Sequence, residues 1–312
     1  MMQYHLGWVD TAFRPTKQKT GKRLRPVMCL LVCETTSGQY ETALPAAVAI
    51  EVLHNFSLIH DDIEDQDTER HNRPTVWAEW GIAQGINTGD AMFVLAHSAL
   101  HSLLHREAPP VPQTKKIIQR FDETTLALCQ GQYLDISFEP RKDVAVEDYL
   151  QMIRGKTAAL LAYATESGAI LGGASDKTTE FYRQFGEAVG MAFQMIDDEL
   201  GIWGNTSATG KPVGSDLRQR KKSLPVVYAM SSLTGPDSAE LRRLYDADEP
   251  LSDSSVRRMT TLLERTGARD FVRSLAGEWE ERALRALDEA GPTGPSGDLL
   301  RNLTTALLTR TF

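Results

Sequence analysis

The sequence predicts an all-α protein, a single large helical bundle around a central cavity. Apolar residues recur at helical spacing through almost the whole 312-residue chain. No convincing alternation of apolar and polar residues, bounded by turns, indicates a strand. Glycine and proline mark the points where a helix should stop, and no break is long enough to be a domain linker. We therefore predict one domain over residues 1–312.

The elements follow from these breaks, taken in chain order. The predicted helices span residues 24–36, 42–66, 75–105, 113–137, 146–173, 178–203, 219–233, 238–247, 253–266, 268–290 and 297–310. The glycine and proline breaks are Ser37-Gly38, Arg73-Pro74, Pro109-Pro110, the stretch from Gly210 to Gly214, Gly235-Pro236 and the stretch from Gly291 to Gly297.

The composition argues against some classes of function. A net charge of −8 is unlike that of a protein binding nucleic acid, because such affinity depends on clustered lysine and arginine. No run approaches the roughly 18 to 20 apolar residues of a membrane-spanning helix, and the amino terminus resembles no secretory signal, so we expect a cytoplasmic protein. Cys29, Cys33 and Cys129 form no zinc or redox motif, and we expect all three to be buried.

An acidic motif, Asp61-Asp62-Ile63-Glu64-Asp65, follows an apolar stretch that should be helical. Positions i and i+4 of an α-helix share a face, so Asp61 and Asp65 should point the same way. Like charges this close destabilise a helix unless a cation or a pKa shift relieves them. Mg²⁺ prefers oxygen ligands of this kind, together with substrate phosphates. Taken alone, the motif fits a solvated helix end as well as a metal site.

A second acidic pair, Asp197-Asp198, favours the metal site. It lies within the run VGMAFQMIDDELGIWG, where large apolar residues surround the pair and charges should be rare without partners. Carboxylates on separate helices of a bundle can face each other across a cavity and hold metal together.

Basic residues bracket both acidic motifs. Lys22 and Arg25 stand three residues apart at a predicted helix start, where amide groups and the helix dipole favour anions. Others follow the acidic motifs or interrupt a helical stretch: Arg70, Lys156, Lys211, Lys221 and Lys222. Because arginine and lysine bind phosphate oxygens, the arrangement indicates a site that handles metal and phosphate together.

In this order the motifs resemble those of the trans-prenyltransferase family, also called polyprenyl synthetases. The matching segments, from about Gly21 to Pro225, are GKRLRP, LIHDDIED, RPT, GKT, QMIDD, GKPVGSD and KKSLP. The resemblance implies the isoprenoid synthase bundle, a homodimer and Mg²⁺-dependent, head-to-tail condensation of isopentenyl diphosphate with an allylic diphosphate. The pattern is most similar to geranylgeranyl diphosphate synthase.

The resemblance also implies a role for each matching residue. The isopentenyl diphosphate should be held by Lys22, Arg25, His54 and His71. The allylic diphosphate should be held by three Mg²⁺ ions whose protein ligands are Asp61, Asp62, Asp65, Asp197 and Asp198. The residues assisting at that diphosphate or beside the developing carbocation should be Arg70, Lys156, Thr157, Gln194, Lys211 and Lys221.

Two positions depart from the family pattern. Gly201 ends the second motif, where an aspartate is usual, and glycine has no side chain to bind metal. His71 follows Arg70 where a second arginine is usual. Histidine is only partly charged near neutral pH, so this departure predicts weaker binding of isopentenyl diphosphate.

The product length is predicted from Phe56, which precedes Asp61 by five residues, or roughly 7.5 Å along a helix at 1.5 Å per residue. If the growing tail runs along this helix toward its start, the Phe56 ring should act as a floor. The small Ser57 beside it resembles the pattern of enzymes making twenty-carbon geranylgeranyl diphosphate. Simple core packing of Phe56 is the alternative.

Two other functions remain open. A terpene cyclase or head-to-head synthase on the same helices would fit the DxxED spacing from Asp61 to Asp65 and the presence of His71. It would leave Lys22 and His54 unexplained, and the Asn/Ser/Glu metal motif of cyclases is missing after Asp198. The other is a catalytically silent partner subunit, against which the intact first motif argues.

Overall fold

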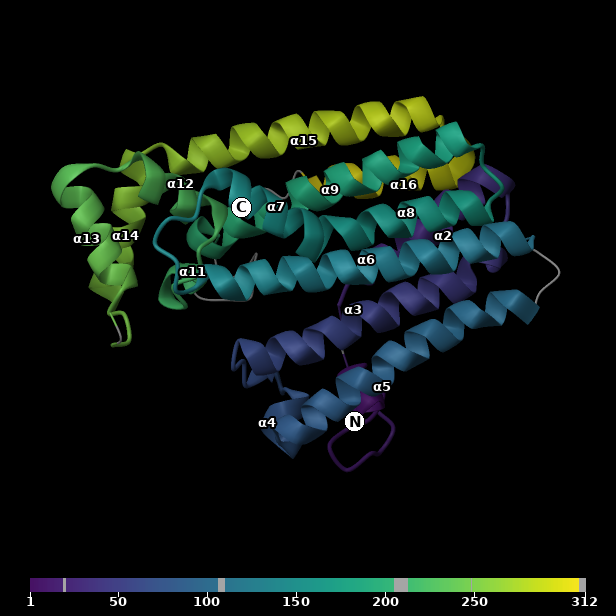
Figure 1. Ribbon diagram of the computed structural model, residues 1–312, viewed down its shortest axis with the longest axis horizontal. Helices are drawn as coiled ribbons and strands as arrows, with labels where there is room; N and C mark the ends of the chain where they lie inside the picture. The colour runs from purple at the N-terminus through teal and green to yellow at the C-terminus, as the bar shows by residue number, and fades with distance from the viewer. Residues whose placement is uncertain (19–20, 106–109, 205–212, 248, 309–312) are drawn as a thin grey trace. The chain divides into compact units, whose positions relative to one another are not determined.

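The computed structural model describes residues 1–18, 21–105, 110–204, 213–247 and 249–308, and nearly all of its regular structure is helical (Figure 1). The prediction of an all-α fold is confirmed. By internal contacts the chain forms two compact units. Unit 1 comprises Met1–Arg120, Ala164–Asp176 and Thr293–Gly297, and unit 2 comprises Phe121–Tyr163, Lys177–Pro292 and Asp298–Phe312. The single domain stays a prediction.

Unit 1 is built around α3, which carries the first acidic motif. Its elements are α1 (Met2–His5), α2 (Leu24–Ser37), η1 (Glu41–Ala43), α3 (Leu44–Glu64), β1 (Glu69–Arg70), β2 (Arg73–Pro74), α4 (Val76–Trp80), α5 (Ile82–His101), η2 (Ser102–His105), and parts of α6 (Val111–Phe138) and α8 (Ala159–Leu171). Helices α3 and α5 lie side by side, and α3 buries Ile50, Leu53 and Ile59 (Figure 1).

The predicted helix 75–105 is interrupted, and a small hairpin precedes it. Gly81, at φ +86°, separates α4 from α5. Strands β1 and β2 pair Arg70 with Arg73, and the two residues between them, His71 and Asn72, both have positive φ. A two-residue hairpin loop requires such backbone angles. The strands have two residues each, too short for an alternating pattern to reveal.

Unit 2 contains the second acidic motif, which lies on α9. This helix has 28 residues, as many as α6. Its elements are the rest of α6 and α8, α7 (Val146–Ile153), η3 (Arg154–Ala158), α9 (Asp176–Trp203) except its first residue, α11 (Ser215–Arg218), α12 (Leu224–Ser232), α13 (Gly235–Tyr245), α14 (Asp253–Arg265), α15 (Ala268–Ala290) and α16 (Gly294–Leu308) from Asp298 onward, all within unit 2. The predicted helix 219–233 begins later, at Leu224, because Arg220 has φ +52° and Ser223 is the N-cap.

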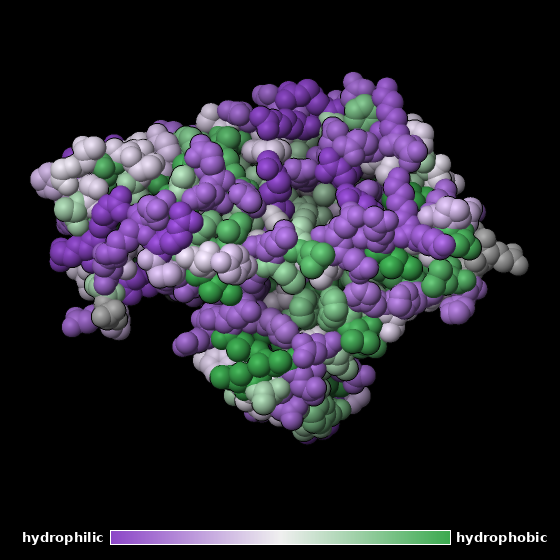
Figure 2. All heavy atoms as spheres, in the orientation of Figure 1, coloured by the Kyte–Doolittle hydropathy of each residue, from purple (hydrophilic) through white to green (hydrophobic). Residues whose placement is uncertain are grey.

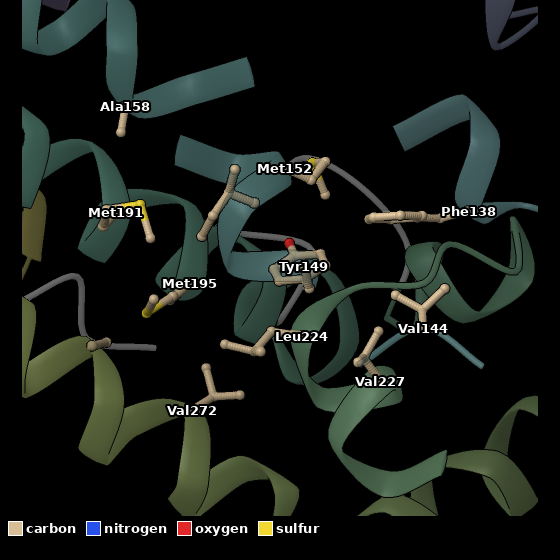
Figure 3. Packing of buried hydrophobic residues seen from close by; sticks show 12 residues of the cluster. Phe138, Val144, Tyr149, Met152, Ala158, Met191, Met195, Leu224, Val227 and Val272 are labelled. Atoms are coloured by element: carbon tan, nitrogen blue, oxygen red, sulfur yellow. The ribbon is translucent and has the colours of Figure 1, made fainter. Parts of the chain in front are cut away.

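Buried apolar residues from several helices form the core of unit 2. One cluster surrounds Tyr149 of α7 with Met152, Met195, Leu224 and Val227, so three helices meet at one ring (Figure 3). This packing holds the second acidic motif against α7 and α12.

Several apolar side chains lie on the surface instead. Figure 2 shows hydrophobic residues gathered over α4 and α5. On α6, Leu126, Cys129, Tyr133 and Ile136 recur at spacings of three and four residues and are all exposed. Cys29 and Cys33 are buried as predicted, but the prediction for Cys129 was wrong. Helical spacing identifies an apolar face of α6 without telling whether the protein covers it.

By length and composition, one stretch of the described residues, Glu41–Glu64, could cross a membrane. It has 24 residues; its most apolar 18 residues have a mean hydropathy of 1.4, and 44% of these are buried. A core helix of a globular protein passes the same test, and α3 packs against α2 and α5 as a core helix does.

Candidate active site

The first acidic motif lies at the carboxyl end of α3. The Asp65 amide donates to the Asp61 carbonyl over 2.8 Å, so the helical geometry that puts the two residues on one face extends to Asp65. The negative end of the helix dipole disfavours acidic side chains there. A bound cation is the natural compensation for carboxylates in this position.

Asp62 differs from its neighbours because it is buried, with 1% of its surface exposed. Arg70 Nε donates to Asp62 Oδ1 over 2.7 Å, whereas Asp62 Oδ2 is buried with no hydrogen-bond partner. Burial raises the pKa of Asp62 to about 6, against the opposing effect of Arg70. A buried carboxylate oxygen left without a donor is a position where a metal ion fits.

The predicted isopentenyl diphosphate residues include a close pair in unit 1. Arg25 Nη1 lies 3.2 Å from His54 Nε2. Burial lowers the pKa of Arg25 to about 10, with Glu51 opposing, and Arg25 Nε is buried without a partner. Burial, and then the charge of Arg25, lower the pKa of His54 well below its usual range. At neutral pH His54 is therefore uncharged and can accept the hydrogen bond from Arg25.

Lys22 and His71, the other two predicted residues, are both exposed. His71 sits in the hairpin loop between Arg70 and Arg73, and partial burial, followed by these two charges, lowers its pKa. It is therefore mostly neutral at pH 7. A lowered pKa makes His71 a weaker cation than the arginine that is usual at this position.

The three consecutive acids of the second motif face three environments. Asp197 is exposed, whereas Asp198 and Glu199 are each 4% exposed. Glu199 Oε1 accepts from Arg269 Nε over 2.7 Å and from Arg273 Nε over 2.8 Å. Because both arginines belong to α15, Glu199 fastens α9 to that helix.

Asp198 is held by donors from three elements. Its Oδ2 accepts from the Tyr149 hydroxyl and, over 2.9 Å, from the Leu224 amide. Its Oδ1 accepts from Gln194 Nε2 over 3.0 Å. Burial raises the pKa of Asp198 to about 7, against the effect of these hydrogen bonds. Gln194 Oε1 in turn accepts from Thr157 Oγ1 over 2.9 Å, which brings three predicted site residues together.

Lys156 and Thr157 lie in a π-helical turn, η3, that interrupts the predicted helix 146–173. The turn packs directly on the α6 backbone: a Cβ on Gly131 would lie 2.2 Å from Lys156 N, and one on Gly155 would lie 2.6 Å from the Ala127 carbonyl oxygen. Lys156 Nζ is 2.5 Å from Asp135 Oδ2 of α6. Single π turns occur frequently at functional sites, where they redirect side chains.

The remaining predicted cations differ in their surroundings. Lys221 is exposed. Lys222 Nζ donates to the carbonyl oxygens of Phe138 and Glu139 at the end of α6, over 2.7 and 2.8 Å, so it serves as a cap of that helix. Lys211 lies outside the described residues.

Phe56 lies on the α3 surface that faces α5, and Ser57 follows it on the same helix. The Phe56 ring contacts Phe93 of α5, with ring centroids 5.4 Å apart, and His60, with centroids 4.8 Å apart. Ser57 Oγ donates to the His54 carbonyl over 2.9 Å. One turn further along α5, the His97 ring lies against Phe93, with ring centroids 4.7 Å apart.

Sequence reasoning missed several residues that support the site. Tyr149 and Asp135 precede the GKT motif on different helices, so nothing along the chain links them to Asp198 or Lys156. Asp216 was quoted only as the end of GKPVGSD, yet it lies against Gly201. The glycines in CQGQ and RGKT were a usable signal, because glycine inside a helix often marks a close backbone approach.

Comparisons with known proteins agree with these motifs. The family model described as polyprenyl synthetase matches residues 7–263. Among relatives from Mycobacterium tuberculosis, a (2E,6E)-farnesyl diphosphate synthase is 39% identical over 304 residues, covering 96% of this chain and 82% of the relative. A geranylgeranyl diphosphate synthase is 38% identical over 290 residues, covering 93% and 81%.

Solved structures are similar over nearly the whole chain. A polyprenyl synthetase from Streptomyces coelicolor A3(2) has 40% identity and a TM-score of 0.88, covering 98% of this chain and 89% of that one. A geranylgeranyl pyrophosphate synthase from Corynebacterium glutamicum, complexed with isoprenyl diphosphate and magnesium, has 25% identity and a TM-score of 0.84, covering 94% and 87%. The family match, the extent of these alignments and the ordered motifs lead to one conclusion: the chain belongs to the polyprenyl synthetase family and is an isoprenyl diphosphate synthase.

Proposed function

We propose that this protein condenses isopentenyl diphosphate with an allylic diphosphate, head to tail, to an all-trans prenyl diphosphate of twenty carbons. The observation that carries the proposal is the carboxyl end of α3, where Asp61 and Asp65 share a face and buried Asp62 has one oxygen without a hydrogen-bond partner. The Arg25–His54 pair supports a second anionic substrate, because a buried guanidinium retains donors for phosphate.

The proposed metal ligands are Asp61, Asp62, Asp65, Asp197 and Asp198, which together would hold three Mg²⁺ ions. Magnesium is the ion expected for oxygen donors of this kind, and the Corynebacterium relative was solved with it. When bound, Mg²⁺ would withdraw charge from the allylic diphosphate and so favour its departure. The cations proposed to assist there are Arg70, Lys156, Lys211 and Lys221.

The chain's own groups suffice for the steps that follow. Lys22, Arg25, His54 and His71 hold the diphosphate of isopentenyl diphosphate, so that its double bond points at the reacting carbon. The allylic carbon–oxygen bond breaks, a carbon–carbon bond forms from the double bond, and the proton lost leaves with the departed diphosphate. Thr157 and Gln194 would lie beside the developing cation. Water must be excluded, because it would capture the cation.

The twenty-carbon length rests on Phe56 as the floor for the tail. Its ring is packed against Phe93, so it has a defined position on the α3–α5 surface. The two Mycobacterium relatives bear the names of a fifteen-carbon and a twenty-carbon synthase at nearly equal identity, so fifteen carbons is the competing result.

A cytoplasmic homodimer is the proposed working state, with no nucleic acid and no membrane anchor. The exposed side chains Leu126, Tyr133 and Ile136 form an apolar stripe on α6, and Val94, Ile82 and Ile86 are exposed on α5. A second copy of the chain covering such surfaces would remove them from water. Light scattering on the purified protein tests the dimer, and Tyr133→Glu should shift it toward the monomer.

The decisive experiment offers purified protein isopentenyl diphosphate and primers of five, ten and fifteen carbons, with Mg²⁺ and with EDTA. Mass spectrometry of the extracted products should show Mg²⁺-dependent elongation to twenty carbons. A hydrocarbon or alcohol made from one allylic diphosphate alone would point to a cyclase or head-to-head synthase. No turnover under any condition would point to a non-catalytic partner subunit.

A further inference from the structure

We propose that Tyr149 is a positioning residue. Through Asp198 and Gln194 it fixes the direction of a series of hydrogen bonds ending at Thr157, so that Thr157 presents lone pairs, not its proton, to the allylic cation. This inference rests on the proposed function, in which Thr157 lies beside that cation. It concerns a different property of the site: the orientation of the groups that surround the cation.

The series of hydrogen bonds joins four side chains of unit 2. The Tyr149 hydroxyl of α7 donates to Asp198 Oδ2, and the Leu224 amide at the start of α12 donates to the same oxygen over 2.9 Å. Gln194 Nε2 donates to Asp198 Oδ1 over 3.0 Å, and Thr157 Oγ1 donates to Gln194 Oε1 over 2.9 Å. Each of the four side chains is therefore joined to the next by a hydrogen bond.

The direction of this chain follows from the chemistry of its members. The Tyr149 hydroxyl and the Leu224 amide both donate to Asp198 Oδ2, and the Gln194 amide group donates to Oδ1, so Asp198 is the acceptor in each of these bonds. With its NH₂ group turned to Asp198, Gln194 leaves its carbonyl oxygen for Thr157. A threonine hydroxyl has one proton, and this proton is used by Gln194. The other side of Thr157 Oγ1 carries only lone pairs, which attract a carbocation where a proton would repel it.

Tyr149 anchors the chain at the end away from Thr157. With two donors on Oδ2, the Asp198 carboxylate is held in one orientation, with Oδ1 left for Gln194. The ring of Tyr149 packs among Met152, Met195, Leu224 and Val227 (Figure 3). A phenylalanine ring would fill the same apolar space. The hydroxyl therefore serves the hydrogen bond, because burying it without a partner would cost stability.

The test is a double-mutant cycle between Tyr149→Phe and Thr157→Val, measured as kcat and as KM for each substrate. Thr157→Val should lower kcat about 100-fold and Tyr149→Phe about tenfold, both with KM nearly unchanged, since positioned donors and acceptors act in the transition state. The double variant should be no slower than Thr157→Val alone, because Tyr149 acts through Thr157. Thr157→Ser, which keeps the hydroxyl, should recover most of the rate.

Additive losses in the double variant would overturn the inference, as would a Tyr149→Phe variant with unchanged kcat. A Tyr149→Phe variant that only needs more Mg²⁺ for half-maximal rate would also overturn it, since Tyr149 would then support the metal site. Thermal unfolding of each variant without substrate separates loss of fold from loss of rate. If Tyr149→Phe does not fold, Gln194→Met breaks the same chain, and Thr157→Val should then have no further effect in its background.

Failure of this inference can be distinguished from failure of the proposed function. A wild-type protein that makes no prenyl diphosphate contradicts the function itself. A wild-type protein that elongates normally, with no coupling between Tyr149 and Thr157, contradicts only this inference.

Discussion

The Asp216 carboxylate packs directly against Gly201 in unit 2: a Cβ added to Gly201 would lie 2.1 Å from Asp216 Oδ2 and 2.3 Å from its Cγ. Ser215 Oγ lies 3.3 Å from the Gly201 carbonyl, which joins the two segments at the same point. The glycine that ends the second acidic motif therefore does not leave a gap. It leaves room for the carboxylate of Asp216, fifteen residues further on by the numbering of the chain.

Replacing Gly201 with alanine should displace Asp216. We expect a loss of about 1 to 3 kcal/mol in the free energy of unfolding, because the new methyl group has no space, and a clear fall in kcat. The matched control is Gly277→Ala in α15, where a Cβ meets nothing within 4 Å, and which should stabilise the helix by about 0.5 to 1 kcal/mol. Urea unfolding measures both. Equal effects of the two substitutions would contradict the close approach.

Gly131→Ala should damage the π-helical turn. Its Cβ would meet the Lys156 backbone nitrogen at 2.2 Å, and backbone cannot move aside as a side chain can. We expect at least about 3 kcal/mol of destabilisation and a loss of turnover larger than the loss of folded protein. Circular dichroism gives the folded fraction and product formation gives the rate. A variant as stable and active as wild type would show that η3 does not pack on α6 in this way.

Removing Arg70 should leave Asp62 buried without its ion-pair partner. In metal-free buffer, Arg70→Ala should cost about 3 kcal/mol at pH 8 and less at pH 5. The pKa of Asp62 is raised to about 6, so below that pH the carboxyl is protonated and the missing cation matters less. Arg285→Ala, which breaks an exposed ion pair with Glu281, should cost under about 0.5 kcal/mol at either pH. A penalty at pH 5 as large as at pH 8 would contradict the pairing.

His5 should make the protein less stable in mild acid. Burial, and then the charge of Arg70, lower the pKa of its imidazole to about 3, while a hydrogen bond with Asn55 opposes them. The unfolded chain takes up the proton near pH 6.5 and the folded one does not, so stability is lost as the pH falls below that value. At pH 5 the loss is about 2 kcal/mol.

Thermal unfolding between pH 7.5 and pH 5 measures this loss in wild type and in His5→Gln. The variant should lose less stability than wild type over the same range, because glutamine does not titrate. The exposed His105, changed to glutamine, serves as the control and should leave the wild-type slope unchanged. Parallel curves for wild type and His5→Gln would exclude His5 as the source.

Phe56→Ala should lengthen the product if the ring is the floor for the tail. Phe93 lies beside Phe56, with centroids 5.4 Å apart, so the single change should give a mixture and the double change with Phe93→Ala a clearer shift. Mass spectrometry of the prenyl products measures the distribution. Tyr40→Ala, at an exposed site beyond α2, controls for general loosening. An unchanged product length in an active double variant would remove Phe56 from this role.

Much of the fold followed from local patterns. Helical spacing and the breaks at glycine and proline located α2, α3, α6, α9 and α15 closely, because a helix end is set by residues within one turn of it. The hairpin at residues 69–74 and the π turn were missed. Each depends on partners elsewhere: Arg70 of the hairpin donates to Asp62 of α3, and η3 lies where Gly131 and Gly155 bring two helices into close approach.

By itself, the sequence determined the all-helical fold, the family and the order of its acidic and basic motifs, since these depend on residue types and their spacing. Tertiary structure alone decided which acid of each motif is buried. Asp62 meets Arg70 on a hairpin, and Asp198 meets Tyr149 and the start of α12, whereas Asp197 is exposed. Adjacent aspartates are alike in sequence. Their surroundings come from segments brought near by folding, and these set each charge, orientation and role.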